Sequence, residues 1–283
     1  MIPDSIHPAI AKMLLAIALL FGATCVAAAD EEIPAHLTLR IPSKLLGETR
    51  VINVYVPPGY SGKDETRYPA LFMLDGGEKE DFPHLASTLD ALIKANTIPP
   101  MLLVGIENTE RRRDLTGPTT VDSDREIAPV VGESAAFRSF ISQELMPQIH
   151  AFYKVNDDTA IIGESLAGLF AVETLFVQPD LFDTYIALDP SLGWNAGQWW
   201  REAGTRLNGS VDINARLFLA SAGDSGDSIA HFADALCRNP LPNLHWTYAP
   251  HPKLRHANIF RKLEKEILTQ AFSGEAMPAP KCD

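Results

Sequence analysis

The stretch Ala160-Ile161-Ile162-Gly163-Glu164-Ser165-Leu166-Ala167-Gly168-Leu169 carries the pattern that decides the fold. An apolar run leads into a short turn, and a second apolar run follows the turn directly. This order predicts a buried strand, a sharp bend and a helix. Gly163 and the small Ala167 relieve the backbone crowding of such a bend. The bend would place the hydroxyl of Ser165 at a helix N-terminus, where N–H groups favour developing negative charge.

Ser165 has two interpretations at this point. The pattern is G-x-S-x-G with Ala167 in place of the last glycine, and in that context a serine hydroxyl is lifted off a sheet toward a base that activates it. The same residue could instead cap a helix that follows a buried strand. The predicted strand, turn and helix favour the nucleophile.

Strand-like and helix-like segments alternate along most of the chain. The alternation predicts an α/β fold, with a mostly parallel central sheet and helices on both faces. No long linker divides the segments, so we expect one domain over 30–283, with its core at about 35–272. The expected strands are 37–41, 50–56, 68–74, 101–106, 159–162, 185–188, 216–221 and 245–249, the expected helices are 82–95, 134–153, 166–177, 229–237 and 257–272, and long loops are expected at 107–132 and 189–209.

Composition and residue spacing argue against a nucleic-acid-binding protein and against a metalloprotein. The chain has 283 residues, of which 46% are hydrophobic and 21% charged, with a net charge of −12, as in soluble globular proteins. No basic patch could follow a phosphate backbone, so nucleic acid is not an expected partner. Because no His/Cys cluster has zinc spacing, no metal is expected.

The first 29 residues predict a secretory signal peptide. Lys12 precedes an apolar run, 13–22, and small residues lead to Ala27-Ala28-Ala29 before Asp30. The run is too short to span a bilayer as a resident helix, so no membrane is expected for the mature chain. A retained anchor, or lipidation of Cys25, is the alternative.

Export would deliver the mature chain to the periplasm or the medium with two cysteines, Cys237 and Cys282. In an oxidising compartment these two residues could form a disulfide.

A serine nucleophile needs a carboxylate and a histidine, which follow it in that order in this type of fold. His256 lies between an expected strand and an expected helix, the position for the base, and His251 on the same loop is the alternative. After the strand 216–221, Asp224 is nearest the strand end and is favoured as the acid. Asp227 is the alternative acid, although it could equally cap the next helix. The other histidines are expected at the surface or at helix ends.

Two backbone N–H groups are expected to form an oxyanion hole. One belongs to Leu166, which follows the nucleophile, and the other to Gly77 in the loop after the third strand, with Gly76 as the alternative. The same Asp-Gly sequence could also be a simple turn.

Two loops could line a substrate pocket. Arg111 could bind an anionic or catecholate part of a substrate, whereas Arg113 could do so or could brace its loop by pairing with Asp114. Trp194 in a cleft would suit flat or glycosidic groups, or could pack against the long loop.

The motifs that support a family resemblance are Val54-Tyr55-Val56-Pro57-Pro58-Gly59-Tyr60, Leu74-Asp75-Gly76, Arg111-x-Arg113-Asp114-Leu115-Thr116, Gly163-x-Ser165-Leu166-x-Gly168, Asp189-Pro190-Ser191 with Trp194, and His256. With these motifs the sequence resembles the putative-esterase (esterase D-like) branch of the α/β-hydrolases over about residues 35–272. It looks closest to the siderophore esterases of the salmochelin and bacillibactin trilactone type. Ala167, and Gly193 in place of a bulkier residue before Trp194, depart from that pattern.

The resemblance implies an α/β-hydrolase fold and a small-molecule ester substrate. Ser165 would attack the ester carbonyl, His256 would act as general base and then acid, and Leu166 and Gly77 would bind the oxyanion. No cofactor or metal is implied. Feruloyl, acetyl or acyl-sugar esterases and acyltransferases share these motifs, and a ligand-binding protein without catalysis is the alternative of another class.

Overall fold

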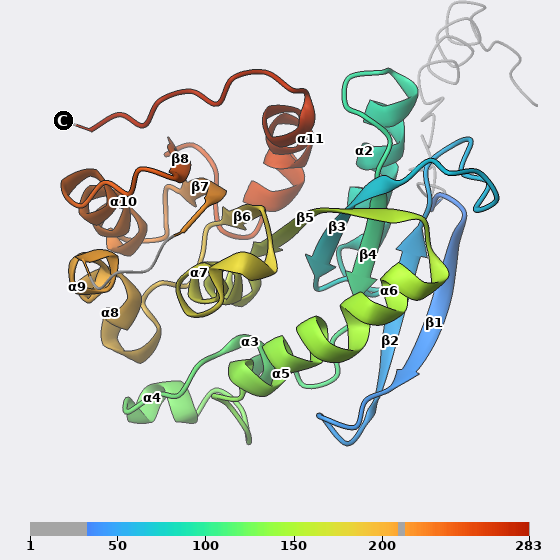
Figure 1. The fold of residues 1–283 in the computed structure, drawn as a ribbon. Helices are drawn as coiled ribbons and strands as arrows, with labels where there is room; N and C mark the ends of the chain where they lie inside the picture. Colours follow the sequence, from blue (N-terminus) through green and yellow to red (C-terminus); the bar gives the residue numbers. More distant parts are fainter. Residues whose placement is uncertain (1–32, 209–212, 283) are drawn as a thin grey trace, which may run out of the picture. The chain divides into compact units, whose positions relative to one another are not determined.

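The computed structural model describes residues 33–208 and 213–282, and the expected signal peptide lies outside them. The described strands are β1 (His36–Pro42), β2 (Thr49–Tyr55), β3 (Tyr68–Leu74), β4 (Leu102–Ile106), β5 (Val155–Glu164), β6 (Thr184–Leu188), β7 (Ala215–Ala222) and β8 (Leu244–His251). They form one sheet in the order β1-β2-β4-β3-β5-β6-β7-β8 (Figure 1). β2 pairs antiparallel with β1 and with β4, and all other neighbours are parallel. The expected mostly parallel sheet is confirmed.

Helices cover both faces of this sheet. One face packs against α2 (Phe82–Lys94) and α11 (Ile259–Phe272). The other packs against α5 (Ser134–Phe140), α6 (Met146–Phe152), α7 (Leu166–Val177), α8 (Trp194–Arg201), α9 (Ala203–Asn208) and α10 (Ser228–Arg238). In β6, Tyr185 and Ala187 join one core while Ile186 and Leu188 join the other. This alternation explains why the central strands are apolar throughout.

β5 begins at Val155, ahead of the expected strand 159–162, and three further segments contain helical turns that the sequence-based expectation lacked. The helix expected at 134–153 passes from α5 into α6 through a π-helical turn, Ile141–Leu145, just before Pro147. Pro147 lacks a backbone N–H, which disturbs the regular α-helical pattern. The loop 107–132 contains the short helices α3 (Arg111–Leu115) and α4 (Asp122–Arg125), and the loop 189–209 contains α8 and α9.

The carboxyl ends of β5, β6, β7 and β8 meet at one edge of the sheet, because these four strands run parallel. Ser165 follows β5, Asp189 follows β6, and the segments after β7 and β8 begin at the same edge. Side chains far apart in the sequence are thereby brought to one place. Within the described ranges, none of the helices has the length and apolar character needed to cross a bilayer.

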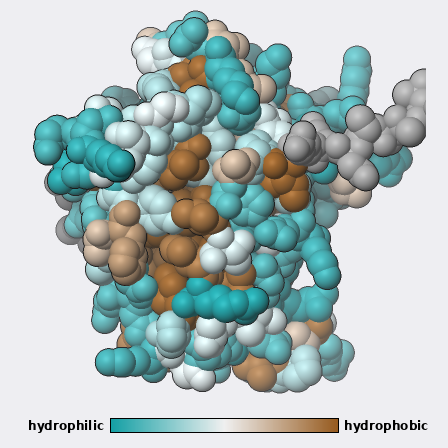
Figure 2. All heavy atoms as spheres, turned by 90° about the vertical axis from the view of Figure 1, so that its right-hand side faces the viewer, coloured by the Kyte–Doolittle hydropathy of each residue, from teal (hydrophilic) through white to brown (hydrophobic). Residues whose placement is uncertain are grey.

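Apolar side chains are also exposed near the antiparallel edge of the sheet. Leu37 of β1 is 60% exposed and Phe152 of α6 is 71% exposed. Figure 2 shows apolar residues gathered among polar ones on the face that is turned toward the right in Figure 1, where β1 and α6 lie. Apolar atoms make up much of the accessible surface of soluble proteins, so this exposure needs no special explanation.

A buried histidine links α2 to α11. His84 was expected at the surface or at a helix end; it lies in the first turn of α2 and is only 2% exposed. Its Nε2 lies 2.9 Å from Asp81, and its Nδ1 contacts Glu264, which also accepts a hydrogen bond from Thr88. Burial alone lowers the pKa of His84, but the hydrogen bonds and charges of Asp81 and Glu264 outweigh burial and raise this pKa to about 9.

We expect His84 to stabilise the fold most strongly at neutral and acidic pH. Because its pKa is raised on folding, its contribution is fully present below the ordinary value of 6.5 and is lost as the pH rises through about 9. His84→Gln should therefore lower the free energy of unfolding by roughly 3 kcal/mol more at pH 6 than at pH 10. Urea unfolding at both pH values measures the difference. The exposed His245→Gln is the control, and an effect of His84→Gln that does not change with pH would contradict the interpretation.

A disulfide joins α10 to the C-terminal tail. It links Cys237 with Cys282 and closes a segment that contains β8, His256 and α11, with a sequence separation of 45. A crosslink of this length restricts the unfolded chain.

Loss of the disulfide is expected to lower the free energy of unfolding by up to about 4 kcal/mol, the chain-entropy value for a loop of this size. Cys237→Ala and Cys282→Ala should have equal effects, and the double variant should lose no more than either single variant. Denaturant unfolding of the four proteins, with and without reductant, checks this. A reductant that lowered the stability of the variants as much as that of the wild type would argue against the crosslink.

Candidate active site

Ser165 occupies a strained turn between β5 and α7. Its backbone has φ 61° and ψ −121°, a conformation that non-glycine residues rarely adopt. Its N–H donates to the carbonyl of Leu188, and its own carbonyl accepts from the N–H groups of Leu169 and Ser191, which hold the turn in place. A Cβ on Gly163 would lie 2.6 Å from the Cβ of Ala167. Glycine is thus required at 163, and Ala167 fits where the motif usually has glycine.

His256 reaches Ser165 from the loop between β8 and α11. The imidazole Nε2 lies 3.0 Å from the Oγ of Ser165. The alternative, His251, is the last residue of β8. The structure therefore brings together the two side chains that sequence reasoning placed at the centre of the site.

Asp189 is the carboxylate that contacts the imidazole. Its Oδ2 lies 2.5 Å from the Nδ1 of His256. Asp189 directly follows β6 and is only 1% exposed. The N–H of Ala222 donates to its Oδ1 at 2.9 Å and the hydroxyl of Ser225 donates to its Oδ2 at 2.6 Å. These hydrogen bonds fix the orientation of the carboxylate and, through it, of the imidazole ring.

The structure corrects the expectation that Asp224 or Asp227 faces the imidazole. Asp224 instead accepts a hydrogen bond of 2.8 Å from the backbone N–H of His256, so it anchors the loop rather than the ring. Asp227 is the residue before α10 and makes no side-chain capping bond. Asp189 directly follows a buried strand in the sequence, but the pairing of that strand with the strand of Ser165, which distinguishes Asp189 from Asp224, is visible only in the structure.

The two expected oxyanion donors differ in their surroundings. Leu166 is the first residue of α7, so its N–H has no partner within the helix. The N–H of Gly77 donates to the carboxylate of Glu80 at 2.7 Å, and that of Gly76 donates to the carbonyl of Ile106. A substrate carbonyl would have to displace Glu80 to reach Gly77.

Each of the three expected substrate-binding residues has a hydrogen-bond or ion-pair partner within the protein. Arg111 forms a bidentate ion pair with Asp75, in which two guanidinium nitrogens donate to the two carboxylate oxygens at 2.6 and 2.8 Å. The Arg111 side chain is partly exposed. Arg113 pairs with Glu48 and Asp114, which supports the bracing role. The indole of Trp194 is buried and donates to the carbonyl of Gly117.

Two further groups beside Ser165 were missed by sequence reasoning. The hydroxyl of Ser191 lies 3.3 Å from that of Ser165. An oxygen of Glu164 lies 3.9 Å from the Nδ1 of His256. Burial raises the pKa of Glu164 to about 7, and the electrostatic interaction with His256 works in the opposite direction. A carboxyl group that titrates near neutral pH thus lies beside the imidazole.

Comparison with known proteins connects this site to a family. The family model described as "Putative esterase" matches residues 43–231. The chain is 30% identical to the ferri-bacillibactin esterase BesA of Bacillus subtilis over 162 residues, 52% of this chain and 56% of that protein. It is 41% identical to the siderophore triacetylfusarinine C esterase of Aspergillus fumigatus over 91 residues, 30% of this chain and 29% of that protein. The chain thus matches about half or less of the length of these curated relatives.

A solved structure gives a wider match. The IroE-like serine hydrolase from Shewanella oneidensis has a TM-score of 0.78 and 27% sequence identity, and the similarity covers 86% of this chain and 82% of that one. The resemblance inferred from the motifs is therefore confirmed at the level of the family and the fold. The chain belongs to the putative esterase family.

Proposed function

We propose that this chain is a serine esterase that hydrolyses carboxylic esters through an acyl-enzyme. The observation that carries the proposal is the series of contacts from Ser165 through His256 to Asp189, at 3.0 and 2.5 Å. A hydroxyl beside one imidazole nitrogen, with the other nitrogen held by a buried carboxylate, is the arrangement that activates a weak nucleophile. Family membership supports the same chemistry.

The reaction follows from this geometry. Asp189 accepts the Nδ1–H of His256, so the lone pair of Nε2 faces the hydroxyl of Ser165. Nε2 takes the hydroxyl proton as Oγ bonds to the ester carbonyl carbon. The carbonyl oxygen becomes negative and accepts a hydrogen bond from the N–H of Leu166.

The remaining steps return the site to its starting state. The imidazolium gives its proton to the leaving alcohol as the C–O bond breaks, and the acid remains esterified to Ser165. His256 then deprotonates a water molecule that attacks this ester, and the free acid leaves as the proton returns to Oγ.

We infer that the substrate is a small-molecule ester of the siderophore type, processed outside the cytoplasm. The named activities of the two curated relatives support this substrate class. The N-terminal apolar run and the disulfide between Cys237 and Cys282 support export, since such bonds persist in oxidising compartments.

Hydrolysis of an ester panel tests the proposal. The panel contains p-nitrophenyl acetate and butyrate, a catecholate trilactone, a feruloyl ester and an acetylated sugar. We expect turnover with free acid as the main product, and fastest turnover of the trilactone. Acyl transfer to an added alcohol would indicate an acyltransferase instead, and binding of the trilactone without release of acid would indicate a ligand-binding protein.

A further inference from the structure

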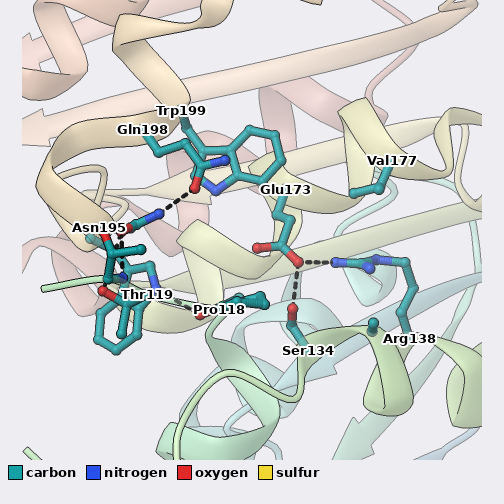
Figure 3. Close-up of a pocket in the computed structure, with 13 residues that line it drawn as sticks. Pro118, Thr119, Ser134, Arg138, Glu173, Val177, Asn195, Gln198 and Trp199 are labelled. Atoms are coloured by element: carbon teal, nitrogen blue, oxygen red, sulfur yellow. Dashed lines mark hydrogen bonds and ion pairs between the residues drawn. The ribbon is translucent and has the colours of Figure 1, made fainter. Parts of the chain in front are cut away.

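A pocket lies away from the reacting groups, between α5, α7, α8 and residues 117–120 (Figure 3). Its volume is about 420 Å³, within the range of small-molecule sites. Neither Ser165 nor His256 lines it. Glu173, which does, lies eight residues along α7 from Ser165, or about 12 Å at the usual helical rise.

Glu173 offers an unused hydrogen-bond acceptor to this pocket. The residue is only 5% exposed. Its Oε1 accepts hydrogen bonds from Arg138, at 2.5 Å, and from Ser134. Its Oε2 accepts none from any described residue, and Figure 3 shows this oxygen turned toward the middle of the pocket. Oε2 is not among the fully buried, unpaired side-chain atoms of the described residues, so it is open to the pocket and free to accept a hydrogen bond from a ligand.

The carboxylate of Glu173 is held in a fixed position. The Nε of Arg138 donates to the hydroxyl of Thr174 at 3.0 Å, and its guanidinium lies 5.1 Å from the ring centre of Phe170. A Cβ on Gly117 would lie 2.6 Å from Oε2, so glycine at this position leaves the oxygen accessible. The ion pair with Arg138 therefore holds the carboxylate of Glu173 in place and balances its negative charge, while Oε2 stays available as an acceptor.

The opposite wall of the pocket is shaped by a strained segment of α8. Asn195 and Ala196 have φ values of 48° and 55°, which are costly for non-glycine residues. Asn195 keeps this conformation because its N–H donates to Asp124 at 2.8 Å and its side-chain oxygen accepts from the N–H of Thr120 at 2.9 Å. Its side-chain amide donates to the Oε1 of Gln198, which leaves the amide nitrogen of Gln198 available as a donor. The pocket thus exists before any ligand enters.

We propose that this pocket binds a neutral ring that carries hydroxyl groups, with one hydroxyl donating to Oε2 of Glu173 and another accepting from the amide of Gln198. The indole of Trp199 and the ring of Pro118 supply apolar wall beside these polar groups. The ligand is neutral because Arg138 already balances Glu173, so an added charge would be buried without a counter-charge. A sugar and a phenolic ring share this chemistry.

Binding of two simple probes tests the site. Methyl β-D-glucopyranoside represents the sugar source and catechol the phenolic source, and neither contains an ester. We expect at least one of them to bind the full-length protein in calorimetric titration, and the one that binds identifies the source. Fluorophosphonate labelling of Ser165 should leave the affinity unchanged. Absence of binding by both probes, or loss of binding on labelling, would overturn the proposal.

Substitutions locate the bound probe. Val177 lies at the rim and is 56% exposed, so Val177→Trp should fill the entrance without disturbing the core and weaken binding at least about tenfold. Glu173→Gln should weaken it by a similar factor, because a hydrogen bond to a charged acceptor is lost. Leu45→Trp, at a 45% exposed position between β1 and β2, is the matched control and should have no effect. Equal affinities in Val177→Trp and Leu45→Trp would place the probe elsewhere and refute the assignment.

Discussion

Replacing Asp189 with asparagine is expected to lower kcat for ester hydrolysis by about 1,000- to 10,000-fold, with little change in KM. The asparagine amide would donate to the Nδ1 of His256, so the ring would carry its proton on Nε2 and present an N–H to Ser165 instead of a lone pair. The effect on KM is small because the buried carboxylate does not line the side of the ring that meets the substrate. Steady-state kinetics with p-nitrophenyl butyrate measures both constants.

The matched control for this substitution is Asp224→Asn. Asparagine at 224 can still accept the backbone N–H of His256 through its side-chain oxygen, so kcat should fall by less than about tenfold. Thermal unfolding of both variants checks that the fold is intact. If the two variants lost activity equally, or if Asp224→Asn were the more damaging, Asp189 would not be the group that orients the imidazole.

Replacing Ser165 with alanine is expected to reduce kcat by about a million-fold, the scale seen when the nucleophile of a serine hydrolase is removed. The loss is larger than for Asp189 because no acyl-enzyme can form without the hydroxyl. The wild type should also take up one fluorophosphonate per chain, and Ser165→Ala should take up none. Kinetics and intact-protein mass spectrometry measure the two effects.

Ser191→Ala provides the control for Ser165→Ala. It removes a hydroxyl that lies only 3.3 Å from the Oγ of Ser165, in the neighbouring segment after β6. Loss of this one neutral hydrogen bond should change kcat by about tenfold at most and leave the labelling intact. Labelling that persists in Ser165→Ala but disappears in Ser191→Ala would show that Ser191, rather than Ser165, is the nucleophile, and would contradict our proposal.

The sequence was sufficient to predict the fold and two of the three central side chains, because the signals for these features are local. The apolar strand, the small residues at 163 and 167 and the helix after them define the turn of Ser165 without reference to the rest of the chain. His256 follows from its place between the last strand and the last helix.

The acid could not be assigned in this way, because its position depends on which loop ends nearest the imidazole. Asp189, Asp224 and Asp227 all follow strands at the same sheet edge, and only the three-dimensional course of the loops separates them. The hydrogen bonds from the N–H of Gly77 to Glu80 and from the indole of Trp194 to the carbonyl of Gly117 could not be predicted for the same reason. The sequence pattern does not show that these groups already have partners within the protein.

The pairing of β5 with β6 has a consequence for how such a site can change over time. Glu164 lies opposite Leu188 in the ladder, so the next residues, Ser165 and Asp189, leave the sheet side by side. The backbone of the sheet sets the spacing of these two groups, and only the imidazole arrives on a separate loop. Lengthening or shortening that loop would move the imidazole away from Ser165 and Asp189 and abolish catalysis while the sheet stays folded. Descendants of such a chain could therefore lose or regain catalysis through a change in one segment.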